Sequence, residues 1–454
     1  MAAYSKDELR EAFQLLCGTM RENNAIDSGS YASYHVKRGL RNSDGTGVMA
    51  GLTKICSVDG YYVRDGERVP QPGRLYYRGI DMTDLIAGAR AEGRFGYEEV
   101  AWLLLFGSLP TKANLAMFQD VLAGCRELPP SFLEDVIMKV PSPDIMNKMA
   151  RSVLSLYTYD DRADDASLEN VLRQSVQLIA RLPAIMAYSY QVKRRAYDKA
   201  SMVLHPIQPE QATAEIILST IRSDQAFTAE EAALLDICLI LHAEHGGGNN
   251  STFATRVLTS SGTDTYAALA AGIGSLKGPK HGGANIKVAE MLQYMIDGID
   301  DITNEGQVAD FLVKLLRRQA GDGSGLIYGM GHAVYTLSDP RAEALKQYAR
   351  DFAERSDRAA QFRLLETVER LTPDLFAKIR GDRKEMCANV DLYSGLLYEM
   401  LGIPQDLFTP IFALARAAGW CAHRLEELQT GGRIMRPAYK SVAGKQAYRA
   451  LAER

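Results

Sequence analysis

The sequence lacks the features that would place it at a membrane, on nucleic acid or in an oxidising compartment. No apolar run reaches the roughly 18 residues that a membrane helix needs, and Met1–Arg21 is too charged for a signal peptide. A net charge of −4 gives no basic excess for nucleic acid. The six cysteines form no CxxC pair, which favours reduced, mostly structural thiols. We therefore expect a cytoplasmic protein with no membrane or nucleic-acid partner.

Nucleotide-binding fingerprints and parallel-sheet signals are also missing. Neither a Walker A pattern nor a Rossmann fingerprint after a strand is present. Strand signals are confined to Gly51–Tyr62 and Arg64–Arg78, where a short hairpin is possible, and no regular βα alternation follows. A doubly wound α/β fold is thereby excluded.

Helical signals dominate what is present. Thr228 with Glu231, and Ser131 with Glu134, each match a capping box ahead of an apolar run. Periodic apolar residues predict a helix between Glu305 and Gly321. With 454 residues, the chain exceeds what one core usually fills. The sequence predicts an all-α protein of two or three domains.

Two prolines and one apolar run predict further helices. Asp339-Pro340 and Thr372-Pro373 each resemble an N-cap followed by proline in the first turn. Phe408–Leu428 reads as a long buried helix. The first forty or so residues, charged and polar after one amphipathic stretch, read as a peripheral arm.

Three of the seven histidines lie against glycines. His245 precedes Gly246–Gly248, His281 lies between Gly278 and Gly282, and His332 follows Gly331. Glycine lets the backbone turn sharply and lets a ligand approach. The alternative is that the glycines end helices and each histidine caps a helix or lies on the surface. Three such clusters favour a functional site.

His242 and His245 form an HxxH pair at the end of a predicted helix. Residues at i and i+3 share a helix face, so a metal site is conceivable. Third and fourth ligands at a familiar spacing are absent from the sequence. We therefore expect no metal.

One carboxylate and three arginines complete the candidate site. Asp391 lies in a polar island before an apolar helix, and the alternative reading is a helix N-cap. Arg416 lies within an apolar run, where a charge needs a partner, so it serves a structural salt bridge or a substrate carboxylate. Arg341 and Arg436 are further candidates for binding an anionic substrate. A base, neutral donors and anion clamps suit an enolising condensation.

Seven segments resemble the citrate synthase family, in order. The match runs from about residue 45 to the C-terminus. The segments are LYYRGID (Leu75–Asp81), HAEHGGGNNSTFATRV (His242–Val257), GPKHGGAN (Gly278–Asn285), GMGHAVYTLSDPRA (Gly329–Ala342), NVDLYSG (Asn389–Gly395), TPIFALARAAGWCAH (Thr409–His423) and RIMRP (Arg433–Pro437).

The resemblance implies three catalytic residues. By position, His281 resembles the donor to the acyl-CoA thioester oxygen, and Asp391 resembles the base that takes the α-proton. His332 resembles the acid that protonates the ketone oxygen of oxaloacetate. The implied reaction joins acetyl-CoA to oxaloacetate and hydrolyses the adduct to citrate and CoA, an acyltransferase activity of the tricarboxylic acid cycle with no permanently bound cofactor.

The resemblance also implies the binding residues. His245, Arg341 and Arg416 match the residues that hold oxaloacetate and citrate, and Asn249 and Phe412 match lesser pocket positions.

Two further positions carry expectations about assembly and CoA. Arg436 matches an arginine that the family supplies from the neighbouring subunit, which implies a homodimer. Lys384 lies where the family often has a basic residue for CoA. The sequence departs from the family pattern at Met330, Thr336 and Ala388, positions that the resemblance places near the CoA side.

The implied fold is a two-domain helical one with an inserted small domain that closes over the large one. The parts are an arm over 1–45, a large domain over 46–283 and 397–454, and a small domain over 284–396. Two alternatives stay open: a 2-methylcitrate synthase that uses propionyl-CoA, since one methylene is worth only roughly 1–3 kcal/mol, and a non-catalytic paralogue that binds CoA or an organic acid.

Overall fold

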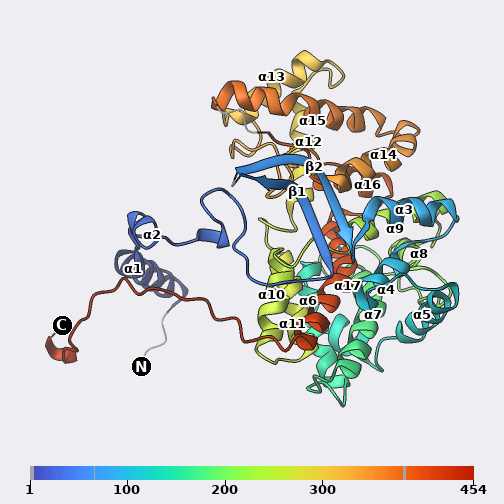
Figure 1. The fold of residues 1–454 in the computed structure, drawn as a ribbon, viewed down its shortest axis with the longest axis horizontal. Coiled ribbons are helices and arrows are strands. Elements are labelled where there is room, and N and C mark those ends of the chain that lie inside the picture. Colours follow the sequence, from blue (N-terminus) through green and yellow to red (C-terminus); the bar gives the residue numbers. More distant parts are fainter. Residues whose placement is uncertain (1–4, 66, 382–384, 454) are drawn as a thin grey trace. The chain divides into compact units, whose positions relative to one another are not determined.

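The computed structural model describes residues 5–65, 67–381 and 385–453. The chain divides into two units. One unit comprises Gly51–Met435 and holds most of the elements labelled in Figure 1; the other joins Met1–Ala50 to Arg436–Arg454. The division into an arm, a large domain and an inserted small domain stays a prediction.

A β-hairpin opens the Gly51–Met435 unit, as the sequence predicts. Strands β1 (Cys56–Arg64) and β2 (Glu67–Tyr77) pair antiparallel, and a two-residue strand β3 (Ile80–Asp81) extends the sheet to the order β1-β2-β3. The remaining elements of this unit are helical, which confirms the all-α class.

The helices of the first half precede the predicted small domain. They are α3 (Met82–Ala91), α4 (Tyr97–Phe106), α5 (Lys112–Cys125), α6 (Ile145–Leu156), α7 (Leu168–Ala196), α8 (Thr213–Ile221), α9 (Ala229–His242), α10 (Asn250–Ser260) and α11 (Thr265–Leu276).

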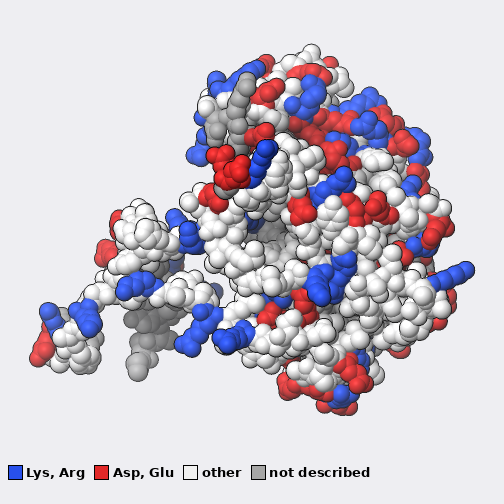
Figure 2. Space-filling model, viewed as in Figure 1, with Lys and Arg blue, Asp and Glu red and all other residues white. Residues whose placement is uncertain are grey.

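The helices of the second half follow the His281 loop. They are α12 (Ala284–Gly298), α13 (Glu305–Leu316), α14 (Pro340–Glu354), α15 (Ala359–Arg380), α16 (Asp391–Met400) and α17 (Phe408–Gln429). In this group α13 packs on α15, α12 packs on α16, and α14 packs on both α15 and α16. Acidic and basic side chains are interspersed over α13–α15 on the face seen in Figure 2, in ion pairs such as Arg363–Glu354.

Two of the predicted helix starts are confirmed. Thr228 caps α9 in a capping box with Glu231, and the Asp339 side chain accepts the backbone N–H of Arg341 at the start of α14. The periodic residues of the 305–316 segment are buried along α13. Local capping chemistry therefore fixed these ends.

Two other helix starts were wrong. Ser131 has a left-handed φ of 61°, and the segment Leu133–Met138 winds as a short π-helix, so no capping box forms there. Pro373 lies inside α15 rather than at its start, because the helix already begins at Ala359 on the strength of buried residues such as Phe362 and Leu365. Tertiary packing overrode the local proline signal.

Helix α17 forms the centre of the core. It contacts α4, α7, α9, α10 and α11, and nearly every residue from Phe408 to Arg424 is buried. The predicted long buried helix is confirmed. Arg416 and His423, both fully buried, are carried on it.

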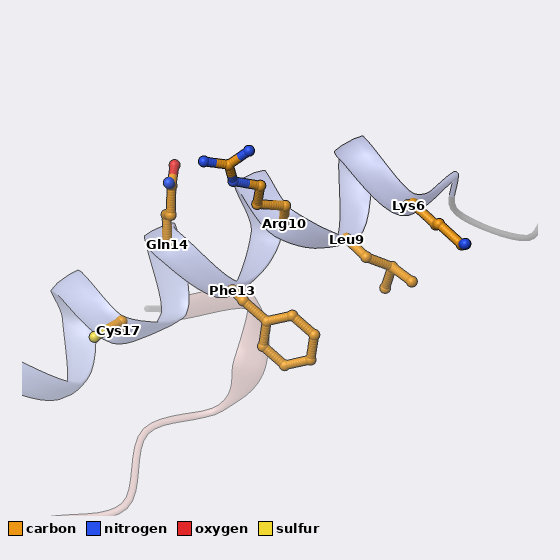
Figure 3. A pocket seen from close by; sticks show the side chains of 6 residues that line it. All are labelled: Lys6, Leu9, Arg10, Phe13, Gln14 and Cys17. Atoms are coloured by element: carbon orange, nitrogen blue, oxygen red, sulfur yellow. The ribbon is translucent and has the colours of Figure 1, made fainter. Parts of the chain in front are cut away.

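The other unit has a different character. Its helix α1 (Lys6–Asn24) begins in a capping box at Ser5, and a short helix α2 (Gly29–Ser33) follows; no described residue of either helix is buried. Figure 3 shows a pocket whose six lining side chains all come from α1, among them Leu9 and Phe13. One helix cannot enclose a substrate, so this surface is no candidate active site.

A membrane span is not found among the helices that the structure describes.

Candidate active site

Arg416 on α17 is a fully buried cation without a carboxylate bonded to it. Its Nε donates to the carbonyl of His242 at 2.6 Å, and its guanidinium carbon lies 4.9 Å from the centre of the Phe412 ring. The two terminal nitrogens Nη1 and Nη2 are buried and have no hydrogen-bond partner among the described residues. Burial lowers the pKa of Arg416, and the charge of Glu244 opposes this shift. A buried guanidinium with two open nitrogens suits a bound carboxylate.

His245 lies just beyond the end of α9. The helix stops at His242, so the predicted HxxH pair does not share a helix face, and the geometric basis for a metal site was wrong. The Nε2 atom of His245 is buried and has no hydrogen-bond partner among the residues described. Burial, with the charge of Arg341, holds the pKa of His245 well below its usual value. His245 is therefore a neutral ring.

Arg341 is held at the start of α14. Its Nε and Nη2 donate to the Asp339 carboxylate at 3.0 and 2.7 Å, a bidentate pair that is almost completely buried. Burial disfavours the charged form, but Asp339 outweighs burial and raises the pKa of Arg341. The guanidinium is thus fixed in one orientation.

The loop before α14 places His332 beside His245. The two rings meet edge to face with centroids 5.1 Å apart, and Tyr335 stacks on His332 at 4.7 Å. Nδ1 of His332 accepts the backbone N–H groups of Val334 and Tyr335 at 3.1 and 3.0 Å. A nitrogen that accepts two N–H groups carries no proton, so the proton of His332 lies on Nε2.

Asp391 is the first residue of α16 rather than its N-cap. Asn389 accepts its backbone N–H at 3.1 Å, while Oδ1 of Asp391 is buried and has no hydrogen-bond partner within residues 5–65, 67–381 and 385–453. Burial raises the pKa of Asp391 to about 6, although Arg341 acts in the opposite direction. A carboxylate that is ionised near neutral pH yet unpaired suits a general base.

Backbone pairing joins the His332 loop to Asp391. Met330 and Ala388, two departures from the family pattern, form an antiparallel bridge, and the Asn389 N–H donates to the Gly329 carbonyl at 2.9 Å. Gly329 has φ +82°, and a Cβ there would lie 2.8 Å from Leu392. Only glycine allows this close approach. The third departure, Thr336, has a buried hydroxyl for which the described residues offer no hydrogen-bond partner.

His281 lies in the loop between α11 and α12. The backbone N–H of Ser251 donates to Nε2 of His281 at 3.3 Å, and the Ser251 hydroxyl lies 3.0 Å from the same nitrogen. The proton of the neutral ring therefore lies on Nδ1. Burial, with the charge of Arg416, lowers the pKa of His281 to about 4. His281 is a neutral donor at physiological pH.

Two lesser pocket positions support these residues. Phe412 stacks on His242 with centroids 4.3 Å apart and underlies Arg416. Asn249, the N-cap residue of α10, accepts the Ser251 hydroxyl at 2.9 Å, so it acts on His281 through Ser251.

Two predicted residues lie elsewhere. Arg436 is exposed and belongs to the unit that contains the chain termini. Lys384 lies outside the described residues. Both roles stay predictions.

Four residues of the site region were missed: Ser251, Tyr335, Asp339 and Glu244. All four lie within three residues of a predicted one, so proximity in sequence was the available signal. Their roles depend on contacts that local patterns do not reveal.

The arrangement combines a base, two neutral imidazole donors and two buried arginines. The protons of the two donors lie on different ring nitrogens, Nδ1 in His281 and Nε2 in His332. Within the described residues, no group of His, Cys, Asp or Glu side chains could hold a metal ion. Such a site can bind a dicarboxylate and remove a carbon-bound proton under general acid–base catalysis.

Comparison with known proteins agrees with this chemistry. A family model described as citrate synthase, C-terminal domain, matches residues 42–438. The chain belongs to the citrate synthase family. A curated citrate synthase of Acidithiobacillus ferridurans is 36% identical, over 86% of this chain and 92% of the relative. A 2-methylcitrate synthase of Shewanella oneidensis is 32% identical, over 80% of this chain and 87% of the relative.

Solved structures of citrate synthases share the fold. The Pyrobaculum aerophilum structure has a TM-score of 0.73 and 29% identity, over 90% of this chain and 94% of that one. A Thermoplasma acidophilum citrate synthase, solved as a ternary complex with carboxymethyl coenzyme A and oxaloacetate, has a TM-score of 0.74 at 24% identity, over 92% and 99%. The all-α citrate synthase fold is thereby confirmed.

Proposed function

We propose that this chain is an acyltransferase that condenses acetyl-CoA with oxaloacetate and hydrolyses the citryl-CoA adduct to citrate and CoA. This is the entry reaction of the tricarboxylic acid cycle. Relatives named citrate synthase, and the Thermoplasma acidophilum complex with oxaloacetate and a CoA derivative, support the proposal.

The observation that carries the proposal is the pair of open nitrogens on Arg416. A fully buried guanidinium with two unpaired N–H groups is costly unless a ligand pairs with it. Arg341 lies in the same region, since its charge bears on the pKa of Asp391 and of His245. Two arginines beside an unpaired base fit a dicarboxylate that reacts next to its carboxyl groups.

In the first step, Asp391 takes a proton from the methyl group of the acyl thioester. That proton is far less acidic than a carboxylic acid, so the developing oxyanion needs stabilisation. The Nδ1–H of His281 donates to the thioester oxygen and stabilises the enol or enolate as it forms. The raised pKa of Asp391, about 6, makes this carboxylate a stronger base than an ordinary aspartate, and it is still ionised at pH 7.

In the second step, the enol carbon attacks the ketone carbon of oxaloacetate. Arg341, Arg416 and His245 hold the carboxylates and the ketone in place. The Nε2–H of His332 protonates the ketone oxygen as the carbon–carbon bond forms. Water then cleaves the thioester, which releases CoA and citrate.

A thiol-release assay tests the proposal. Purified protein with acetyl-CoA and oxaloacetate is expected to release free CoA thiol, and citrate is expected to accumulate in equal amount. Thiol release without citrate would indicate a simple thioesterase instead. Absence of both products would support a non-catalytic CoA- or acid-binding paralogue, an alternative that the presence of both His281 and Asp391 disfavours.

A second candidate activity is 2-methylcitrate synthesis from propionyl-CoA. The 32%-identical Shewanella oneidensis relative supports it. One methylene changes binding by only roughly 1–3 kcal/mol. The ratio of kcat/KM for acetyl-CoA and propionyl-CoA decides between the two, and a ratio above one is expected here.

The proposal extends to assembly and location. We infer a homodimer in which Arg436 reaches the partner's site and Lys384 contacts CoA; light scattering that gives a fully active monomer would contradict the dimer. The six cysteines are all free, which supports a reducing, cytoplasmic environment. Fractionation of the source cells tests that location.

A further inference from the structure

The proposed reaction leaves one buried carboxylate of the site region unused. Glu244 is fully buried between His242 and Gly246. Its Oε1 accepts the backbone N–H of Gly246 at 2.6 Å. Nε2 of His423 lies 3.1 Å from the same oxygen, a close contact without the alignment of a hydrogen bond, and Oε2 has no partner among the described residues. Burial alone would raise the pKa of Glu244, but the contact with His423 and the charge of Arg416 outweigh burial and lower the pKa. Glu244 is therefore an anion.

A chain of buried polar contacts fixes His423 on α17. Nδ1 of His423 accepts from Nε and Nη2 of Arg256 at 3.0 and 2.7 Å. Arg256 is held in turn by Glu427, at 2.7 Å, and by Glu426. Because Nδ1 accepts from a guanidinium, it carries no proton, and the proton of His423 lies on Nε2, the nitrogen that lies near Glu244.

Glu244 lies against α17 close to Arg416 but does not bond to it. A Cβ at Gly419, three residues after Arg416 on α17, would lie 2.2 Å from Oε2 of Glu244. Opposite charges in a buried region normally form a direct, bidentate pair. Instead Glu244 Oε2 and both terminal nitrogens of Arg416 have no hydrogen-bond partner in the part of the chain that the structure describes.

We propose that His423 and the Gly246 N–H tether Glu244 away from Arg416. Tethered there, Glu244 balances the buried charge of Arg416 while the terminal nitrogens stay open for a substrate carboxylate. Glu244 and His423 are thus positioning residues. The inference rests on the proposed function, because the carboxylate that binds Arg416 is the one of oxaloacetate.

The sharpest test removes the tether with His423→Leu. The released Glu244 then closes onto Arg416 and competes with oxaloacetate. Calorimetry is expected to show the Kd for oxaloacetate rising at least about tenfold, the equivalent of one charge-assisted hydrogen bond. KM for oxaloacetate should follow, while KM for acetyl-CoA and kcat at saturation change less than about threefold.

Two further variants separate tethering from a merely structural role. The double variant His423→Leu with Glu244→Gln is expected to regain oxaloacetate affinity, because the internal competitor is gone. His423→Gln keeps a side-chain donor and should bind oxaloacetate within about threefold of the wild type. His205→Leu, the same substitution at a histidine whose ring contacts the Arg222 carbonyl and the Gln225 side chain, is the matched control and should leave the Kd unchanged.

Wild-type affinity in His423→Leu, or a double variant that binds no better than His423→Leu, would overturn the inference. His423→Asn, which is too short to reach Glu244, carries the same expectation if the leucine variant does not fold. Failure of the wild type to bind oxaloacetate would contradict the proposed function instead, so the two failures are distinguishable.

Discussion

Arg416 and His281 are proposed to contact different substrates, and their surroundings differ. Arg416 is fully buried in the central helix α17, with charged Glu244 nearby and two open nitrogens. His281 is half-buried in a loop and contacts the neutral groups of Ser251. The side proposed for the dicarboxylate thus relies on fixed buried charges. The side proposed for the thioester relies on a neutral donor whose tautomer is set by a backbone N–H.

This difference follows from the charge of each proposed substrate group. A carboxylate gains most from full charges in a dry, preorganised setting, where Coulomb attraction is weakly screened. A thioester oxygen becomes negative only as the enolate forms. A neutral donor such as His281 stabilises the enolate as it forms, and it does not attract the carboxylates of oxaloacetate to the thioester position. Four expected outcomes, from the largest effect to the smallest, test this contrast.

Loss of the base should give the largest effect. We expect Asp391→Asn to keep the fold and to lower kcat by on the order of 10²–10⁴, the range for a general base. Hydrogen–deuterium exchange of the acyl methyl group, with a non-reacting oxaloacetate analogue, isolates proton removal, and His281→Ala should slow the same step. Wild-type exchange in either variant would show that base and donor are misassigned.

A matched control for the base is Asp236→Asn. Asp236 is also buried, but it accepts the backbone N–H groups of Gly96 and Tyr97 at the start of α4. This variant should change thermal stability without slowing methyl exchange in the fraction that stays folded.

Arg416→Ala should weaken the binding of oxaloacetate but not the binding of acetyl-CoA. We expect the Kd for oxaloacetate to rise by the equivalent of roughly 1.5–3 kcal/mol, because a charge-assisted carboxylate contact is lost. Binding of acetyl-CoA should change little. Equal weakening of both substrates would point to a structural role for Arg416.

Arg424→Ala is the matched control on the same helix. Arg424 is also buried, but it bonds to Thr259, Thr263 and Thr265. Its loss should lower the melting temperature and leave the ratio of the two substrate affinities unchanged.

The pH dependence of kcat should distinguish the two sides again. Asp391 must be ionised to act, and its pKa is raised to about 6. We therefore expect kcat to be nearly flat above pH 7 and to fall about tenfold per pH unit well below pH 6. His281, with a pKa lowered to about 4, stays neutral across this range. In His281→Ala the fall of kcat at acidic pH should keep the same midpoint. A shifted midpoint would mean that His281, rather than Asp391, titrates there.

The smallest effect is expected from Ser251→Ala. His281 would lose the hydroxyl contact at 3.0 Å but keep the backbone N–H that sets its tautomer. Methyl exchange should slow by only a few-fold, because the hydroxyl donates its proton to Asn249 and the backbone N–H that His281 accepts remains. A drop as large as that of His281→Ala would mean that the hydroxyl, rather than the backbone, orients the ring.

The sequence by itself determined the helical class and pointed to most of the residues that lie together in the candidate active site. Capping at Thr228 and Asp339 and the apolar run of α17 are local properties, so their helix starts were predictable. The helix starts predicted at Ser131 and Pro373 were wrong because they also depend on how neighbouring segments pack. Packing outweighs a local helix-start preference of about 1 kcal/mol.

Only the tertiary structure decided what surrounds each charge. That Arg341 is paired with Asp339, whereas Arg416 has two open nitrogens, depends on contacts between segments far apart in the chain, such as Arg416 with the His242 carbonyl. The same holds for the tautomers of His281 and His423, which are set by Ser251 and Arg256. Burial and hydrogen-bond partners come from packing, and a residue pattern carries neither until the chain has folded.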